Sequence, residues 1–257
     1  METAAKRTLA GAGLGGALCL ALAAAATSPA PAGEAAEIGR QRLEMVRIVE
    51  AETRATFPET GIAALQPKVL EAMGRVPRHS FLPAELRPFA YLPTPLPVTR
   101  DQNIAAPFLV GLMTHLADVQ PGDKVFETGT GAGYHAAVLA ELASEVFSVE
   151  VIEFLAERAR VILEDLGYGD VKVRAGDGYY GWAEAAPFDV IIVKEAVNHL
   201  PGPLLRQLRP GGRMVVPLGP ADSSQILTLV EKTSEGRLRS RGILAVKFSP
   251  LQGGERL

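Results

Sequence analysis

The chain has 257 residues, of which 47% are hydrophobic and 21% are charged, and its formal net charge is −3. This length fits one α/β domain with a small extension and is too short for two full domains. The slightly negative balance, without any run of Lys or Arg, argues against a nucleic-acid-binding protein.

The first 33 residues differ in composition from the rest of the chain. Lys6 and Arg7 precede an uncharged run of mostly Ala, Gly and Leu that extends to Ala26, and the sequence TSPAPAG follows. A basic start, an apolar stretch and a small-residue zone are typical of a secretory signal peptide, with cleavage after Ala26 or Ala32. We therefore expect an exported, periplasmic protein without a stable membrane span after cleavage. An uncleaved anchor and an Ala-rich cytoplasmic tail stay open as alternatives.

Cysteine and histidine usage predicts no metal site. The single cysteine, Cys19, lies in the N-terminal segment, so the cleaved chain would have no disulfide, thiolate nucleophile or cysteine ligand. The histidines have no metal-ligand spacing. They are His79, His115, His135 and His199.

Residues 34–107 are predicted to form a helical extension on the substrate side of the protein. Apolar residues recur with helical spacing over residues 38–65, and a second helix is expected over 67–73. The segment VPRHSFLP and the proline-rich residues 83–97 are expected to be irregular and to wrap over a surface. A further helix is predicted from Pro107 up to the turn PGD.

Residues 108–257 are predicted to form an α/β domain. Short apolar segments alternate with helical ones from KVFET, through EVFSVE, VKVRA and FDVIIV, to RMVVPL. This alternation predicts a mostly parallel sheet with helices on both faces. The last two strands, QILTLVE and ILAVKF, have no helix between them, so an antiparallel edge is expected.

A glycine-rich turn, Gly129-Thr130-Gly131-Ala132-Gly133, follows the first of these strands and opens a helix. Glycines in such a turn allow close approach of the backbone to a nucleotide. On its own, this motif favours a nucleotide site, and a tight turn that binds nothing stays open as the alternative.

Two acidic residues strengthen the nucleotide-binding interpretation. Glu150 ends the next strand, about 20 residues after the first glycine, where an acid accepts hydrogen bonds from ribose hydroxyls. Asp177 follows the third strand, where its carboxylate or the neighbouring backbone could bind the adenine amine. All three features lie at the carboxyl ends of adjacent strands, where open α/β sheets bind ligands.

The glycine spacing favours S-adenosylmethionine over a dinucleotide. The run is G-x-G-x-G and lacks the G-x-G-x-x-G spacing that brings a helix N-terminus to a pyrophosphate. Glu127 lies two residues before the first glycine. A carboxylate there suits the cationic amino-acid end of S-adenosylmethionine and would repel a pyrophosphate.

Several motifs together resemble the protein-L-isoaspartate O-methyltransferase family. They are VPRHSFLP, VFETGTGAGYHAAVLAEL, RAGDGYYGW, PFDVIIV, LRPGGRMVVPLG and VKFSPLQGG, and the resemblance spans residues 44–254. It implies a Rossmann-like sheet with an N-terminal helical extension, a monomer, and methylation of isoaspartyl carboxylates in damaged proteins, a repair reaction. The family is by default cytoplasmic. The resemblance implies that the cofactor contacts Glu127, Gly129, Thr130, Gly131, Glu150, Val151, Asp177 and Gly178.

The same resemblance implies that residues 100–107 lie over the transferring methyl group, and here the chain departs from the family. The family commonly has Gly-Gln-Thr-Ile-Ser, where this chain has Asp101-Gln102-Asn103-Ile104-Ala105. The family's active-site serine therefore falls on Ala105, which has no hydroxyl, and its threonine falls on Asn103. After the fourth strand the family has small residues, whereas this chain has KEAVNH at 194–199.

Methyl transfer to a carboxylate needs no general base, because the nucleophile is already ionised near neutral pH. Loss of one orienting hydroxyl therefore need not abolish the reaction. Three interpretations of the altered loop stay open. Asn103 with Gln102 could hold an isoaspartyl carboxylate; Lys194 or His199 could form a pocket for a different acceptor; or the loop could have drifted with reduced activity. A non-catalytic nucleoside-binding protein and a dinucleotide-dependent dehydrogenase are the alternatives from other functional classes.

Overall fold

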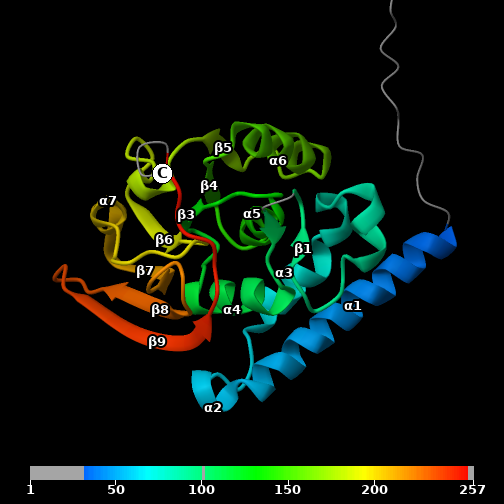
Figure 1. The fold of residues 1–257 in the computed structure, drawn as a ribbon, viewed down its shortest axis with the longest axis horizontal. Helices are drawn as coiled ribbons and strands as arrows, with labels where there is room; N and C mark the ends of the chain where they lie inside the picture. The colour runs from blue at the N-terminus through cyan, green and yellow to red at the C-terminus, as the bar shows by residue number, and fades with distance from the viewer. Residues whose placement is uncertain (1–31, 100–101, 254–257) are drawn as a thin grey trace, which may run out of the picture.

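The computed structural model describes residues 32–99 and 102–253, and within them a seven-stranded sheet forms the centre of the molecule (Figure 1). The strand order is β5-β4-β3-β6-β7-β8-β9. The first four pairings in this order are parallel, and β8 is antiparallel to both of its neighbours. The mostly parallel Rossmann-like sheet with an antiparallel edge is therefore confirmed. The strands are β3 (Lys124–Thr128), β4 (Glu145–Glu150), β5 (Lys172–Ala175), β6 (Phe188–Ile192), β7 (Leu208–Leu218), β8 (Gln225–Lys232) and β9 (Leu238–Val246).

Helices cover both faces of this sheet, and a helical extension precedes it. A two-stranded antiparallel ribbon, β1 (Leu96–Pro97) with β2 (Asn103–Ile104), lies between the extension and the sheet domain. The helices are α1 (Ala32–Ala55), α2 (Phe57–Thr60), α3 (Pro67–Arg75), α4 (Pro107–Ala117), α5 (Tyr134–Ala140), α6 (Glu153–Asp165) and α7 (Gly202–Gln207), with the 3-10 turns η1 (Arg78–Phe81), η2 (Ala84–Phe89) and η3 (Gly178–Tyr180).

The sheet is buried on both faces, and successive side chains of each strand enter different cores because they point to opposite sides. Val125 on β3 and Ile192 on β6 belong to a large core shared with α1, α3, α4 and α5. Phe126 and Ile191, one position away, belong to a smaller core that includes Leu204 of α7. This double burial explains the continuous apolar runs of the parallel strands.

The predicted helix over residues 38–65 is wrong in extent. The chain is helical in α1 and α2 but leaves the helix at Gly61, which has a φ of +68°. A left-handed glycine commonly ends a helix, and Pro67 disfavours helical geometry at the residue before it. The proline-rich residues 83–97 likewise contain the short turn η2, with Pro88 inside it.

The predicted signal segment, residues 1–33, lies almost wholly outside the described residues, so the structure does not test it. Among the residues that are described, no helix is long and apolar enough to cross a membrane.

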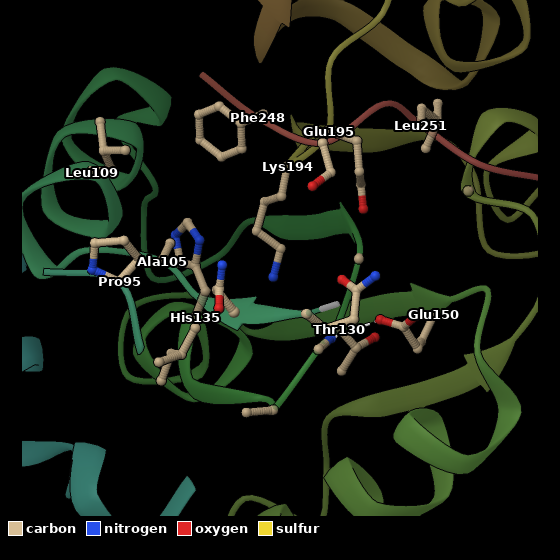
Figure 2. Close-up of a pocket in the computed structure, with 18 of the residues that line it drawn as sticks. Pro95, Ala105, Leu109, Thr130, His135, Glu150, Lys194, Glu195, Phe248 and Leu251 are labelled. Carbon is tan, nitrogen blue, oxygen red and sulfur yellow. Dashed lines mark hydrogen bonds between the residues drawn. The ribbon is translucent and has the colours of Figure 1, made fainter. Parts of the chain in front are cut away.

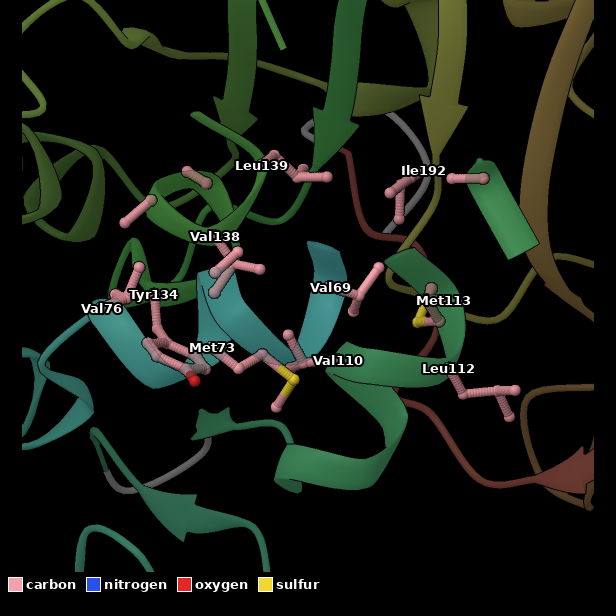
Figure 3. Packing of buried hydrophobic residues seen from close by; sticks show 14 of the residues in the cluster. Val69, Met73, Val76, Val110, Leu112, Met113, Tyr134, Val138, Leu139 and Ile192 are labelled. Carbon is pink, nitrogen blue, oxygen red and sulfur yellow. The ribbon is translucent and has the colours of Figure 1, made fainter. Parts of the chain in front are cut away.

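The extension packs onto the sheet domain through a close contact at Gly111. Figure 3 shows Val69 and Met73 of α3 beside Val110 of α4. A Cβ at Gly111 would lie 2.9 Å from Leu65 Cδ1 and 3.1 Å from Met73 Sδ, so a larger residue there would have to displace these side chains.

We predict that Gly111→Val destabilises the protein by about 1–3 kcal/mol, since overpacking a filled core displaces side chains. Gly39→Ala is the matched control, because nothing lies within 4 Å of a Cβ at that helical position. The control should be neutral or should stabilise by about 0.5–1 kcal/mol. Urea unfolding measures both variants, and equal stabilities would contradict the close-packing argument.

Candidate active site

A cavity of about 280 Å³ opens at the carboxyl ends of the parallel strands. Figure 2 shows Thr130 and Glu150 on one side of it and Pro95, Ala105 and Leu109 on the other, with Lys194 reaching between them. Its walls come from the glycine turn, the β1–β2 ribbon, α4, the end of β6 and the tail at residues 247–252.

The glycine turn adopts the geometry that its residues allow. Gly129, Gly131 and Gly133 have φ values of +61°, +56° and +95°, which favour glycine. A Cβ at Gly129 would also overlap the carboxylate of Glu195. The first glycine is therefore required both by its backbone conformation and by the side chain above it.

Glu127, the penultimate residue of β3, is a fully buried carboxylate. Ser148 Oγ donates to its Oε1 over 2.7 Å, and Lys194 Nζ lies 2.8 Å from its Oε2. Because the Ser148 proton is used in this way, Thr130 Oγ1 donates to Ser148 over 2.5 Å. Burial raises the pKa of Glu127, and the Lys194 ammonium opposes that shift.

Glu150 ends β4 and holds the glycine turn from the opposite side. Its Oε2 accepts from the Gly131 amide over 2.8 Å, and its Oε1 accepts from the Ile152 amide over 3.0 Å. Each carboxylate oxygen retains a second lone pair. The residue lines the cavity, and Val151 beside it is partly exposed.

Asp177 and Gly178 lie at the end of β5. Asp177 Oδ1 accepts from the Tyr179 amide over 2.9 Å and caps η3. Gly178 lines the cavity, and a Cβ there would lie 2.8 Å from Thr128 Cγ2, so glycine is required for the close approach.

The structure brings most of the sequence-predicted site residues together around this one cavity. Two of the predicted residues do not line the cavity. Glu127 is buried behind the cavity-lining Lys194, and Asp177 lies next to the cavity-lining Gly178. Of the charged segment after β6, Lys194 and Glu195 line the cavity, whereas the exposed His199 contacts Tyr179, 3.3 Å away. The predicted residues that line it are Gln102, Asn103, Ala105, Gly129, Thr130, Gly131, Glu150, Val151 and Gly178.

Sequence reasoning missed Arg78, which positions the acceptor-side loop. This fully buried guanidinium donates to the carbonyls of Ala90 and Ala105 over 2.8 Å each. It also stacks over the Tyr134 ring at 4.9 Å. Burial lowers the pKa of Arg78 to about 10. The residue lies inside the recognised segment VPRHSFLP, but a buried arginine binding carbonyls far along the chain has no local signature.

Sequence reasoning also missed the tail at residues 247–252, which forms one wall of the cavity. The Ala196 amide donates to the Ser249 carbonyl over 2.8 Å, and the Leu251 amide donates to the Ala196 carbonyl over 2.9 Å. These bonds fix residues 247–252 beside the end of β6. The motif VKFSPLQGG, one of those that resemble the family, is the sequence feature that could have indicated this role.

Glu195 carries a carboxyl with an unusual pKa. Thr128 Oγ1 donates to its Oε2 and accepts from the Lys194 amide over 3.1 Å. Burial raises the pKa of Glu195 from 4.5 to about 7, although the hydrogen bond from Thr128 and the charge of Lys194 oppose the shift. The carboxyl therefore titrates near neutral pH.

We predict that Glu195→Gln changes how stability depends on pH. Below pH 4.5 the carboxyl is protonated in both folded and unfolded chains, so it favours neither. Between pH 4.5 and 7 the unfolded chain releases the proton first. Wild-type stability therefore falls relative to the variant as pH rises through this window, by about 1–3 kcal/mol in total. Urea unfolding from pH 4.5 to 8.5 would show a growing difference, whereas parallel profiles would contradict the raised pKa. Glu85→Gln, at an exposed glutamate, is the control.

The site has two acids that fit one ligand. The buried Glu127 suits a cationic group, and Glu150 at the end of the next strand suits ribose hydroxyls. On this Rossmann-like sheet they define an S-adenosylmethionine-dependent methyltransferase. A family model described as Protein-L-isoaspartate(D-aspartate) O-methyltransferase (PCMT) matches residues 57–256. The chain belongs to this family.

Relatives and solved structures agree with this assignment. The chain is 51% identical over 216 residues to Protein-L-isoaspartate O-methyltransferase 2 of Syntrophobacter fumaroxidans, covering 84% of this chain and 87% of the relative. It is 52% identical over 209 residues to the enzyme of the same name from Polaromonas sp., covering 81% and 99%. A solved protein-L-isoaspartate O-methyltransferase matches with a TM-score of 0.72 and 27% identity, over 82% of this chain and 66% of that one.

One further structure supports the fold alone. It comes from Plasmodium falciparum, was solved in complex with S-adenosyl-L-homocysteine, and matches with a TM-score of 0.68 and 20% identity. It covers 82% of this chain and 98% of that one.

Proposed function

We propose that this protein methylates the free carboxylate of L-isoaspartyl residues in damaged proteins, using S-adenosylmethionine. The observation that carries the proposal is one cavity with an acidic nucleoside side and an amide-lined, largely apolar acceptor side. S-adenosylmethionine, when bound, supplies a methyl group on a sulfonium, which the acceptor oxygen displaces in line. The partner is thus a protein or peptide with a free carboxylate.

The cofactor side is assigned by charge and hydrogen-bonding capacity. We assign Glu150 to the ribose hydroxyls, because its free lone pairs can accept from both. We assign Glu127 to the cationic amino-acid end, and Gly129 and Gly131 to close backbone contact. The remaining proposed contacts are Thr130, Val151, Asp177 and Gly178.

The acceptor side needs residues that align an oxygen and exclude water, because an ionised carboxylate requires no base. We assign Gln102 and Asn103 to hydrogen bonding with the acceptor and Ala105 to the wall beside it. Arg78 holds the Ala105 carbonyl and so fixes the position of this loop.

We predict that the purified protein forms methyl esters on an isoaspartyl peptide supplied with S-adenosylmethionine. The same peptide with an ordinary aspartyl residue is the control and should remain unmethylated. Methanol released by alkali measures the ester. Cofactor binding without ester formation would favour the second candidate, a related enzyme with a different acceptor, which the absence of a hydroxyl at Ala105 supports. Binding of a nicotinamide dinucleotide instead would contradict the proposal.

We further propose that residues 1–33 export the protein, that residues 34–107 form the substrate-side extension, and that residues 108–257 form the cofactor domain of a monomer. The basic residues and apolar run at the N-terminus support export.

If export is correct, fractionation of expressing cells should recover the protein in the periplasm, with a mature N-terminus after Ala26 or Ala32. A variant without residues 1–26 is the control and should stay in the cytoplasm. An intact N-terminus on cytoplasmic protein would contradict export.

A further inference from the structure

Lys194 separates the buried acid of the site from the cavity. Its side chain is only 12% exposed and lines the cavity, whereas Glu127 is fully buried and does not. The Nζ atom covers Glu127 Oε2 at 2.8 Å. A ligand that enters from the cavity therefore meets the lysine before it meets the carboxylate.

The proposed function leaves Glu127 with two competing cations. If Glu127 takes the ammonium of the cofactor's amino-acid end, then Lys194 loses its ion-pair partner while remaining almost wholly buried. An unpaired buried ammonium is strongly unfavourable. Burial raises the pKa of the neighbouring Glu195, which also gives one oxygen to Thr128, and Glu150 already holds two backbone amides. A carboxylate on the acceptor side is then the anion that would restore a full partner to the lysine.

His135, a second buried residue that lines the cavity, has an acceptor atom that could bind the lysine ammonium. His135 is 4% exposed, and its Nε2 lies 2.9 Å from Thr114 Oγ1. Because Thr114 donates its own proton to the Val110 carbonyl, His135 Nε2 carries the hydrogen of this bond. The neutral ring then presents a bare lone pair at Nδ1, which has no hydrogen-bond partner. Burial and the Lys194 charge both lower the pKa of His135, which keeps the ring neutral.

The acceptor wall near this lysine offers neutral donors but no other buried cation. Gln102 and Asn103 can donate hydrogen bonds, whereas Ala105 and Leu109 are apolar and Lys247 is exposed. Figure 2 shows the His135 ring near Ala105, with Lys194 pointing into the space between the acceptor and cofactor sides. A cation at this junction would attract a carboxylate to the point where the methyl group is transferred.

We propose that Lys194 binds the acceptor carboxylate, its ammonium moving from Glu127 to a position between that carboxylate and His135 Nδ1 when the cofactor occupies Glu127. This inference rests on the proposed function and names the residue that selects an anionic acceptor. The attraction is greatest for the fully charged carboxylate and weakens as methylation removes the charge. Lys194 therefore contributes to acceptor binding more than to the chemical step.

The test measures acceptor binding without turnover. Protein saturated with S-adenosylhomocysteine is titrated with a fluorescent isoaspartyl peptide, followed by anisotropy. Lys194→Met should weaken peptide binding by about tenfold to a hundredfold, as expected for loss of a charged hydrogen bond. S-adenosylhomocysteine affinity, from calorimetry, should hold or rise, because the lysine no longer competes for Glu127, and this binding also shows that the variant is folded. Lys172→Met is the matched control, because this exposed lysine on β5 does not line the cavity, and its loss should change peptide binding much less.

Two further measurements separate this role from a merely structural one. A peptide carrying the isoasparaginyl amide should bind wild type weakly, and the preference for the carboxylate should disappear in Lys194→Met. His135→Leu should weaken peptide binding in wild type but not in the Lys194→Met background. Additive losses would contradict the coupling between the two residues.

A crystal structure with S-adenosylhomocysteine tests the displacement without any acceptor. We expect the Lys194–Glu127 ion pair to be open; a retained ion pair would overturn the inference. So would a Lys194→Met variant that loses S-adenosylhomocysteine binding and keeps peptide binding. If the ion pair opens and the isoaspartyl peptide is neither bound nor methylated, but another peptide with a free carboxylate binds wild type more tightly than Lys194→Met, the proposed acceptor fails and the anion-binding role of Lys194 stands. If no carboxylate peptide depends on Lys194, that role fails as well.

Discussion

The fully buried carboxylate of Glu127 is the constraint around which the site is arranged. A charge without solvent needs partners, and this one has a hydroxyl from β4 on one oxygen and an ammonium from the end of β6 on the other. These contacts tie together the ends of three adjacent strands. Thr130 extends the arrangement into the glycine turn through Ser148. The position of the turn therefore depends on how Glu127 is neutralised, and so does the shape of the cavity.

The sheet could be predicted because each strand is marked by a short apolar run in its own sequence. Residues such as Val125 and Ile192 lie in short apolar runs separated by turns and helices, and double burial leaves no polar face to confuse the pattern. The acids at the ends of β3 and β4 could likewise be placed, because parallel strands end at one edge. Their direct contacts could not be predicted. Ser148 looks like any strand serine until the register sets it beside Glu127.

Contacts between distant segments account for most of what sequence reasoning missed. Arg78 reaches carbonyls at positions 90 and 105, and the tail bonds to Ala196, which lies some 50 residues earlier in the chain. Nothing in the local pattern around either segment specifies such partners. The extent of the first helix was misjudged for a different reason. Apolar residues continue past Thr60, but the left-handed Gly61 turns the chain before the periodicity ends.

The departures from the family motif concern charge as much as hydrogen bonding. The loop has no hydroxyl at Ala105, while Lys194 and Glu195 line the same cavity after the end of β6. A hydroxyl orients a carboxylate without altering the charge of the site. An ammonium adds a positive charge next to a cationic sulfonium, and this is tolerable only with compensating anions. In the structure Glu127 supplies that compensation, and in the proposed complex the acceptor carboxylate supplies it. The lysine and its neighbouring acids therefore form one electrostatic unit, and the identity of the acceptor depends on the unit as a whole.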